Sequence, residues 1–258
     1  MPEFCSVEKE GRLTIVTIQR PEVMNSLHPP ASAELGKVFD EFDADAEQWV
    51  AIITGAGDRA FSAGNDLKYQ ASGGDMGATP FAGFGGITSR FDGTKPIIAA
   101  VNGVAMGGGF EIALACDLIV ASENAIFALP EPRVGLAALA GGIHRLPRQI
   151  GMKRAMGMLL TGRRVSAAEG KELGFVNEVV PQGEALAGAK RWAAQILECA
   201  PLSVRGSKQA AMQGMDAESL EAAIKGKYEQ IQAMYKSADF VEGPLAFAEK
   251  RAPNWKGA

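Results

Sequence analysis

Four short apolar runs, separated by stretches with helical character, limit the folds that this chain of 258 residues can adopt. Residues 13–18 are β-branched and partly alternating, whereas residues 50–54, 97–101 and 117–121 are mostly apolar, as expected of buried strands. Strands that alternate with helices form βα units and a largely parallel sheet. The chain is therefore predicted to have an α/β fold.

Helical periodicity is clearest near the two ends of the chain. Residues 30–43 carry apolar side chains at helical spacing, which predicts an amphipathic helix. Beyond Gly183 helical patterning dominates, with a short last helix expected over residues 241–250. Two apolar stripes lie there: Trp192, Ile196 and Cys199, and then Ile224, Tyr228, Ile231 and Tyr235. We expect a core of residues 1–182 and a helical carboxyl-terminal region of residues 183–258 that packs on neighbouring elements or subunits.

Composition narrows the class of protein. A hydrophobic content of 47% with 22% charged residues is ordinary for a soluble enzyme, and the net charge of −4 argues against nucleic-acid or anionic-membrane partners. Three scattered cysteines form neither a disulfide framework nor a metal-ligand spacing, which favours a reducing compartment. Without a signal-like start or a long apolar stretch, we expect a cytoplasmic protein with no metal and no membrane contact.

A triple glycine, Gly107 to Gly109, follows the apolar run 97–101 and leads directly to Glu111. Glycines after a strand let the backbone approach a ligand and open a helix whose first N–H groups are free. On a helix over residues 107–114, Gly108 and Glu111 would share a face, so an amide and a carboxylate would point into one cavity. Alternatively, Glu111 is only an acidic residue favoured in a first helical turn.

Two further segments carry polar residues in an unusual sequence context. Glu131 lies between Pro130 and Pro132, which either hold its carboxylate rigidly or leave it in an exposed turn. Residues 61–67 contain Gly64, Asn65 and Asp66, which predict a second corner with free amides near Asn65 or else an ordinary helix cap. Two carboxylates and two glycine-built corners can together hold a water and polarise a carbonyl, which indicates chemistry on an acyl group.

The order and content of these segments resemble the crotonase superfamily of enoyl-CoA hydratases and isomerases. The likeness covers most of the chain: residues 25–27, 60–67, 95–103, 107–111, 115–118, 127–135, 141–142, 145–147, 161–162, 174–176 and 254–257. The resemblance implies a spiral of ββα units, a helical carboxyl-terminal trimerisation region, and a homotrimer or a dimer of trimers. It also implies an oxyanion hole for the thioester oxygen, formed by the backbone N–H groups of Asn65 and Gly108.

Both glutamates match positions that carry glutamate in the hydratases of this family, whereas many other members keep only one. The resemblance implies that the pair binds a water, with Glu111 as the base and Glu131 as the proton donor to the α-carbon. We therefore expect an enoyl-CoA hydratase. The alternatives are a double-bond isomerase, a dehydratase of a polar acyl-CoA, or a binding protein on the same scaffold. RNA binding would call for a lysine-rich helix, which is not evident.

The chain departs from the family pattern after the second glutamate. Ala138 replaces a usual proline, and Leu139 replaces a glycine whose amide helps to hold the water, so Leu139 adds bulk beside the expected acyl pocket. Pro132 replaces a usual aliphatic residue. A glycine-rich loop over residues 71–86 is expected to shape or cover that pocket.

Coenzyme A is expected as part of the substrate, with no separate cofactor. The resemblance places its adenine against the loop of residues 24–27 and the backbone near Ala63. Two lysines are candidate phosphate contacts, although a solvated surface charge explains each equally well. The residues expected to bind coenzyme A are Met24, Ser26, Leu27, Ala63, Asp66, Lys68 and Lys256.

Overall fold

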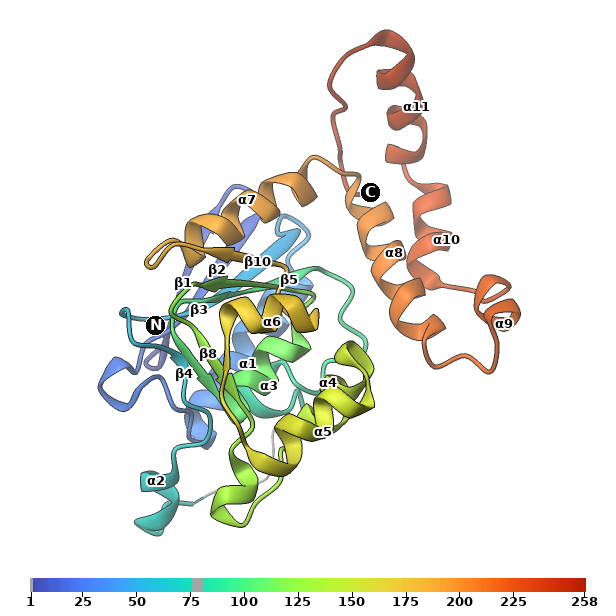
Figure 1. Ribbon diagram of the computed structural model, residues 1–258. Helices are drawn as coiled ribbons and strands as arrows, with labels where there is room; N and C mark the ends of the chain where they lie inside the picture. The colour runs from blue at the N-terminus through green and yellow to red at the C-terminus, as the bar shows by residue number, and fades with distance from the viewer. Residues whose placement is uncertain (1, 76–80) are drawn as a thin grey trace.

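Two sheets of largely parallel strands form the body of the molecule (Figure 1). The computed structural model describes residues 2–75 and 81–258. The larger sheet has the order β1 (Cys5–Glu10), β2 (Leu13–Ile18), β3 (Val50–Gly55), β5 (Ile97–Val101), β7 (Leu118–Ser122) and β10 (Glu178–Val180). The smaller sheet has the order β4 (Ala60–Ser62), β6 (Val104–Met106), β8 (Ile126–Ala128) and β9 (Val165–Ser166). Within the sheets, only β1 with β2 and β8 with β9 pair antiparallel among the described strands.

Successive strands alternate between the two sheets. β3, β5 and β7 lie in the larger sheet, and each is followed directly by its counterpart β4, β6 or β8 in the smaller one. The chain then returns through helical segments, so each turn adds one strand to each sheet. This arrangement is a spiral of ββα turns, and the predicted α/β class is confirmed.

Helices cover the sheets and extend beyond them (Figure 1). The α-helices are α1 (Pro29–Ala44), α2 (Leu67–Ala71), α3 (Gly108–Ala115), α4 (Gly142–Ile150), α5 (Met152–Thr161), α6 (Ala167–Leu173), α7 (Ala185–Leu197), α8 (Pro201–Gly214), α9 (Leu220–Ile224), α10 (Glu229–Lys236) and α11 (Asp239–Glu249). Three 3₁₀ turns complete the set among the described residues: η1 (Pro21–Val23), η2 (Phe84–Gly86) and η3 (Glu131–Val134). No helix in the described ranges combines the length and apolar character needed to cross a membrane.

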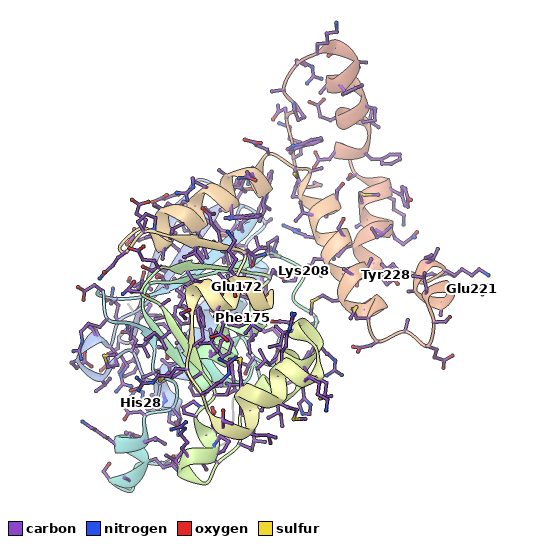
Figure 2. The ribbon with its side chains drawn as sticks, viewed as in Figure 1. His28, Glu172, Phe175, Lys208, Glu221 and Tyr228 are labelled. Atoms are coloured by element: carbon purple, nitrogen blue, oxygen red, sulfur yellow. The ribbon has the colours of Figure 1, made fainter. Side chains whose placement is uncertain are left out.

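The strands and helices predicted from periodicity are found close to their expected bounds. β2 and β5 have the predicted limits, β3 is one residue longer at its end, and β7 is shifted by one residue at both ends. α1 covers the predicted helix because Leu35, Phe39 and Phe42 recur on one face and are buried. The expected stripe from Ile224 to Tyr235 is divided between α9 and α10. The chain leaves the helical path between α9 and α10, where the Tyr228 hydroxyl donates to the carbonyl of Ala223 (2.5 Å; Figure 2).

The main core lies against α3, where three aromatic rings meet. Phe110 on α3, Phe127 on β8 and Phe175 pack with ring centroids 5.0 to 5.2 Å apart. Fully burying one such side chain stabilises a fold by roughly 2–3 kcal/mol. All residues from Gly108 to Leu114 are buried, so α3 is fixed on every side by the core.

A second core lies between the larger sheet and α7. Ala185, Ala189 and Ala193 of α7 are buried there with Ile98 and Val120 of the sheet. The helices from α8 onward project away from the body, and Figure 1 shows them as a separate arm. α7 therefore belongs to the body, and the projecting arm begins at α8. The expected division of the chain at residue 183 stays a prediction.

Hydrogen bonds tie the arm to the body, and Lys208 makes two of them. Lys208 on α8 donates to the carbonyl of Lys95 (2.9 Å) and to the carboxylate of Asp117 (2.8 Å; Figure 2). Large apolar side chains of the arm, such as Leu220 (77% exposed) and Phe247 (87% exposed), remain uncovered in the single chain. The expected trimer or dimer of trimers would bury this surface, and it stays a prediction.

The predicted glycine-rich loop of residues 71–86 is only partly described. Residue 71 ends α2 and residues 84–86 form η2, whereas residues 76–80 lie outside the described residues. η2 lies against α1 and α3, so the far end of the loop is packed on the body.

Helix α3 approaches β4 so closely that Gly109 has no space for a side chain. A Cβ there would overlap the carbonyl oxygen of Ser62. Overpacking of this kind costs about 1–3 kcal/mol, so Gly109→Ala is expected to lower the free energy of unfolding in urea by that amount. The matched control is Gly157→Ala in α5, where nothing lies within 4 Å of the added atom. The control should stabilise the fold by about 0.5–1 kcal/mol, and equal responses would contradict the close packing.

Candidate active site

A sharp backbone corner joins β6 to α3. Gly107 has a positive φ of 53°, and its amide donates to the carbonyl of Ala128 (2.9 Å). α3 begins at Gly108, whose amide donates no hydrogen bond to any described residue. The ring of Phe84 lies against Gly108 and fills the place that a Cβ would take. The corner therefore presents a free amide at a position where an added Cβ would meet the Phe84 ring.

A second corner follows β4 and touches the first. Gly64 has a φ of 87°, and a Cβ on it would lie 2.8 Å from the amide nitrogen of Gly108. Leu27 pairs with this corner, donating its amide to Gly64 (2.8 Å) and accepting from the amide of Asp66 (3.0 Å). The amide of Asn65 lies between these two bonds and donates to none of the described residues. The structure thus brings together the segments that carry the amides of Asn65 and Gly108.

Glu111 lies one turn into α3 and is buried, with 3% of its surface exposed. Its carboxylate oxygen Oε1 accepts from the amide of Gly142 (2.8 Å) at the start of α4. Burial raises the pKa of Glu111 to about 7; the amide of Gly142 opposes this rise and the charge of Glu131 adds to it. A carboxyl group with such a pKa can both take and give a proton near neutrality.

Glu131 begins η3, directly beside the first corner. A Cβ on Gly107 would lie 2.9 Å from its oxygen Oε1, so the carboxylate packs on the corner itself. The other oxygen, Oε2, is buried and has no hydrogen-bond partner among the described residues. Burial raises the pKa of Glu131 as well. The structure thus brings the two predicted glutamates together, close enough for the charge of Glu131 to raise the pKa of Glu111.

A cavity of about 330 Å³ opens beside Glu131. Apart from this glutamate its lining is apolar and comes from the segment after β8, from α4 and from α5. The lining residues are Leu129, Glu131, Pro132, Ala137, Ala138, Ile143, Met156, Leu159 and Leu160. A cavity of this size and character suits an apolar chain rather than a polar group.

Leu139 is not brought into this group. Its side chain is 78% exposed and its amide donates to the carbonyl of Ala137 (2.9 Å), so neither reaches the cavity. The tight turn after Ala137 directs the leucine outward and the preceding residue inward. In the described chain the buried Ala138 lines the cavity, in place of the predicted Leu139.

The loop expected to hold adenine lies beside the second corner. Met24 and Asn25 both have positive φ angles, and the carbonyl of Met24 accepts from the amide of Ala63 (2.9 Å). The side chain of Asn25 holds the loop by donating to the carbonyl of Ala60 (2.7 Å). Ser26 and Leu27 follow in the same buried segment. The predicted residues of this loop are thus adjacent to Ala63, and their part in binding coenzyme A stays a prediction.

The charged residues predicted to contact coenzyme A are placed differently. Asp66 caps α2 by accepting from the amide of Tyr69 (3.1 Å), and it pairs with Arg20 (3.1 Å), so its carboxylate is engaged within the protein. Lys68 is exposed on α2, and Lys256 lies near the C-terminus. Figure 1 shows α2 far from the C-terminus, which lies beside the start of α8. The two lysines are therefore not brought together within one chain.

Gly142 belongs to the site, although the sequence alone does not indicate it. The amide of Gly142 holds Glu111, yet no role was expected for it. The available signal was the glycine pair at the start of a helix, the same pattern that drew attention to residues 107–109. In the described residues, no group of three or more His, Cys, Asp or Glu side chains is placed to hold a metal ion.

Comparison with known proteins places this geometry in a family. The family model described as enoyl-CoA hydratase/isomerase matches residues 8–258. The chain belongs to this family, the crotonase superfamily, and it is an enzyme of that family; the predicted resemblance is confirmed. An acyl-CoA thioester substrate is consistent with this membership.

Individual relatives extend over the whole chain. The carnitinyl-CoA dehydratases of Escherichia coli K12 and Salmonella typhi are 42% and 43% identical, each with full coverage of both chains. Among solved structures, an enoyl-CoA hydratase from Mycobacterium tuberculosis H37Rv has a TM-score of 0.91 and 39% identity over 99% of both chains. A carnitinyl-CoA hydratase from Mycobacterium avium has a TM-score of 0.79 and 41% identity over 100% of both chains. The similarity thus supports crotonase-type hydratase or dehydratase chemistry on an acyl-CoA.

The raised pKa of Glu111 has a consequence for stability. Folding favours the neutral form of this carboxyl. Burying it therefore costs no free energy of folding at a pH below its ordinary pKa of 4.5, and the full cost is reached above a pH of about 7. Glu111→Gln removes this cost and should stabilise the fold by up to about 3 kcal/mol at pH 8 but by almost nothing at pH 4. Urea unfolding at both pH values measures the difference. The exposed Glu8→Gln is the control, and a Glu111→Gln effect that is equal at both pH values would contradict the cost of burying this carboxylate.

Proposed function

We propose that this chain catalyses the reversible addition of water across the 2,3 double bond of a 2-enoyl-CoA thioester, as an enoyl-CoA hydratase. One observation carries the proposal: two carboxylates with raised pKa values, Glu111 and Glu131, lie beside the Gly107–Gly108 corner and an apolar cavity. This arrangement offers a place for a water, a thioester oxygen and an acyl chain within one site.

The two free amides supply electrostatic stabilisation. Attack of water on the β-carbon moves charge onto the thioester oxygen and gives an enolate. The N–H groups of Asn65 and Gly108 would donate to that oxygen, and one preorganised donor of this kind is typically worth about 3–4 kcal/mol. Since both donors are backbone groups, the corners at Gly64 and Gly107 matter more than the side chains beside them.

The glutamates supply the proton transfers. Glu111 takes a proton from the water while the water oxygen bonds to the β-carbon. Glu131 gives a proton to the α-carbon. The unpartnered Oε2 of Glu131 supports this assignment, since a buried carboxyl oxygen without a hydrogen bond is costly unless substrate or water satisfies it. Proton exchange with solvent then restores the starting charges of the pair. In this mechanism the two carboxyls and two amides carry every step, and coenzyme A enters as part of the substrate.

Removal of either carboxylate tests the mechanism. Glu111→Gln and Glu131→Gln are each expected to lower kcat for hydration of crotonyl-CoA by at least about 10²-fold, because general acid–base catalysis typically contributes 10²–10⁴-fold. Circular dichroism and thermal unfolding should show that both variants remain folded. Near-normal hydration by either variant would contradict the two-carboxylate mechanism.

A second candidate function is the dehydration of a polar acyl-CoA. It is favoured by the full-length identity of 42–43% to proteins named carnitinyl-CoA dehydratase. Against it, the cavity is lined by aliphatic side chains, proline and methionine, and among the described residues its lining holds none of the aromatic rings that bind quaternary ammonium groups well. Glu131 is the charged residue of this lining in the described chain.

A substrate panel separates these candidates. With the purified protein, we expect kcat/KM for an unbranched apolar 2-enoyl-CoA to exceed that for carnitinyl-CoA by about tenfold or more, since apolar contacts of one or two methylenes are worth ~10–200-fold. A 3-enoyl-CoA in the same panel reports double-bond isomerisation. Preferred turnover of carnitinyl-CoA, or exclusive turnover of the 3-enoyl-CoA, would replace the proposed hydration with the corresponding alternative.

A further inference from the structure

Arg145 on α4 joins two segments that stand behind the candidate active site. Its Nη2 donates to the carbonyl of Thr88 (2.8 Å), and its Nη1 donates to the carbonyl of Ala140 (3.4 Å). The guanidinium also lies over the ring of Phe91, 5.6 Å from its centroid. Arg145 is half-buried, and its hydrogen bond to Thr88 connects two residues that lie 57 positions apart in the sequence.

The first segment supports Glu111. Ala140 precedes Gly141 and Gly142, and the amide of Gly142 is the group that donates to Glu111 (2.8 Å). Gly141 has a φ of 109°, and a Cβ on it would overlap the Nη1 of Arg145. The guanidinium therefore occupies the space beside the turn, and the turn sets where the Gly142 amide points.

The second segment supports the corner at Gly108. Thr88 lies one turn beyond Phe84, and its amide donates to the carbonyl of Phe84 (3.4 Å). Phe84 packs on Gly108, which presents one of the two free amides. By holding the Thr88 carbonyl, Arg145 fixes the turn from which this ring reaches the corner.

The charge of Arg145 acts on Glu111 as well. Four groups influence the carboxyl from the elements packed on it: the amides of Gly142 and Ala140, the charge of Glu131 and the charge of Arg145. Glu131 opposes ionisation of Glu111, whereas the other three favour it. Arg145 itself interacts with Glu111 and with Cys116, whose buried thiol is kept neutral because burial raises its pKa. Arg145 is thus the cation that favours the charged form of this carboxyl within the described chain.

We propose that Arg145 is a positioning residue of the site, which clamps the segments of residues 84–88 and 140–142 so that the Gly108 amide and the Glu111 carboxylate face the same substrate. The proposal rests on the proposed water addition, because it assigns a task to the supports of that reaction. In the described chain Arg145 neither donates a hydrogen bond to Glu111 nor lines the cavity, so its positioning effect passes through Gly142 and Phe84.

Two variants of Arg145 and one matched control test the proposal. Arg145→Gln removes both the charge and the guanidinium that donates to two carbonyls. Arg145→Lys keeps the charge but loses this pair of donors. Both should lower kcat for crotonyl-CoA by about tenfold to a hundredfold, the cost of a small misplacement of catalytic groups, with KM changed much less. Arg148→Gln is the control, since Arg148 lies on the same helix and donates to the carbonyl of His144, away from both clamped segments.

The pH profile separates positioning from mere structural support. Loss of the cation raises the pKa of Glu111, so the acidic limb of kcat/KM should move to higher pH in Arg145→Gln and stay in place in Arg145→Lys and Arg148→Gln. An unmoved limb in Arg145→Gln, or a loss of thermal stability with unchanged kcat in both variants, would overturn the proposal.

A titration without substrate distinguishes this proposal from the proposed function. The carboxyl carbon of Glu111, labelled with ¹³C and assigned with Glu111→Gln, should titrate at higher pH in Arg145→Gln than in the wild-type chain. If the wild type hydrates no 2-enoyl-CoA but this titration shifts, the proposed function fails while the clamp stands. If hydration is normal and the titration is unchanged, the clamp fails alone.

Discussion

The site depends on one steric constraint, the contact of two backbone corners at the start of α3. Gly64, Gly107 and Gly109 have no room for side chains there, because Cβ atoms would meet the Gly108 amide, Glu131 and the Ser62 carbonyl. Backbone this close to backbone leaves amides without internal partners, and a buried core on every side of α3 holds them in place. The free amides are thus a product of tight packing, and the core stabilises an arrangement that local hydrogen bonding alone would not favour.

Burial also determines the electrostatics of the two glutamates. Glu111 and Glu131 lose hydration on folding and repel each other, and the Gly142 amide recovers only part of this cost for Glu111. The resulting pKa of Glu111, about 7, is useful in acid–base chemistry, while burial of this carboxylate is unfavourable for stability. Catalytic groups held in this way commonly reduce the stability of a fold, which the hydrophobic core offsets. The charge of Arg145 reduces the electrostatic cost of ionising Glu111, although Arg145 does not line the cavity in the described chain.

In the proposed function, the apolar cavity is the part of the site that receives the acyl chain. The cavity beside Glu131 is built from α4, α5 and the segment after β8, none of which supplies the free amides. The free amides and most of the apolar lining therefore come from different segments, whereas Glu131 belongs to both the lining and the pair of carboxylates. Relatives with names for different acyl-CoA reactions show similar identity over the whole chain, as expected where one fold hosts several reactions.

The sequence by itself determined the parallel strands, the first helix and the glycine-marked start of α3, because burial periodicity and glycine conformation are local properties. Its likeness to a known family also indicated Asn65, Gly108, Glu111 and Glu131. It did not reveal the short strands β4, β6 and β8, since three residues carry too little periodicity to recognise. Only the tertiary structure turned Ala138 inward and Leu139 outward, and only it brought Gly142 and Arg145 behind Glu111. These depend on contacts between segments distant along the chain, which no local pattern encodes.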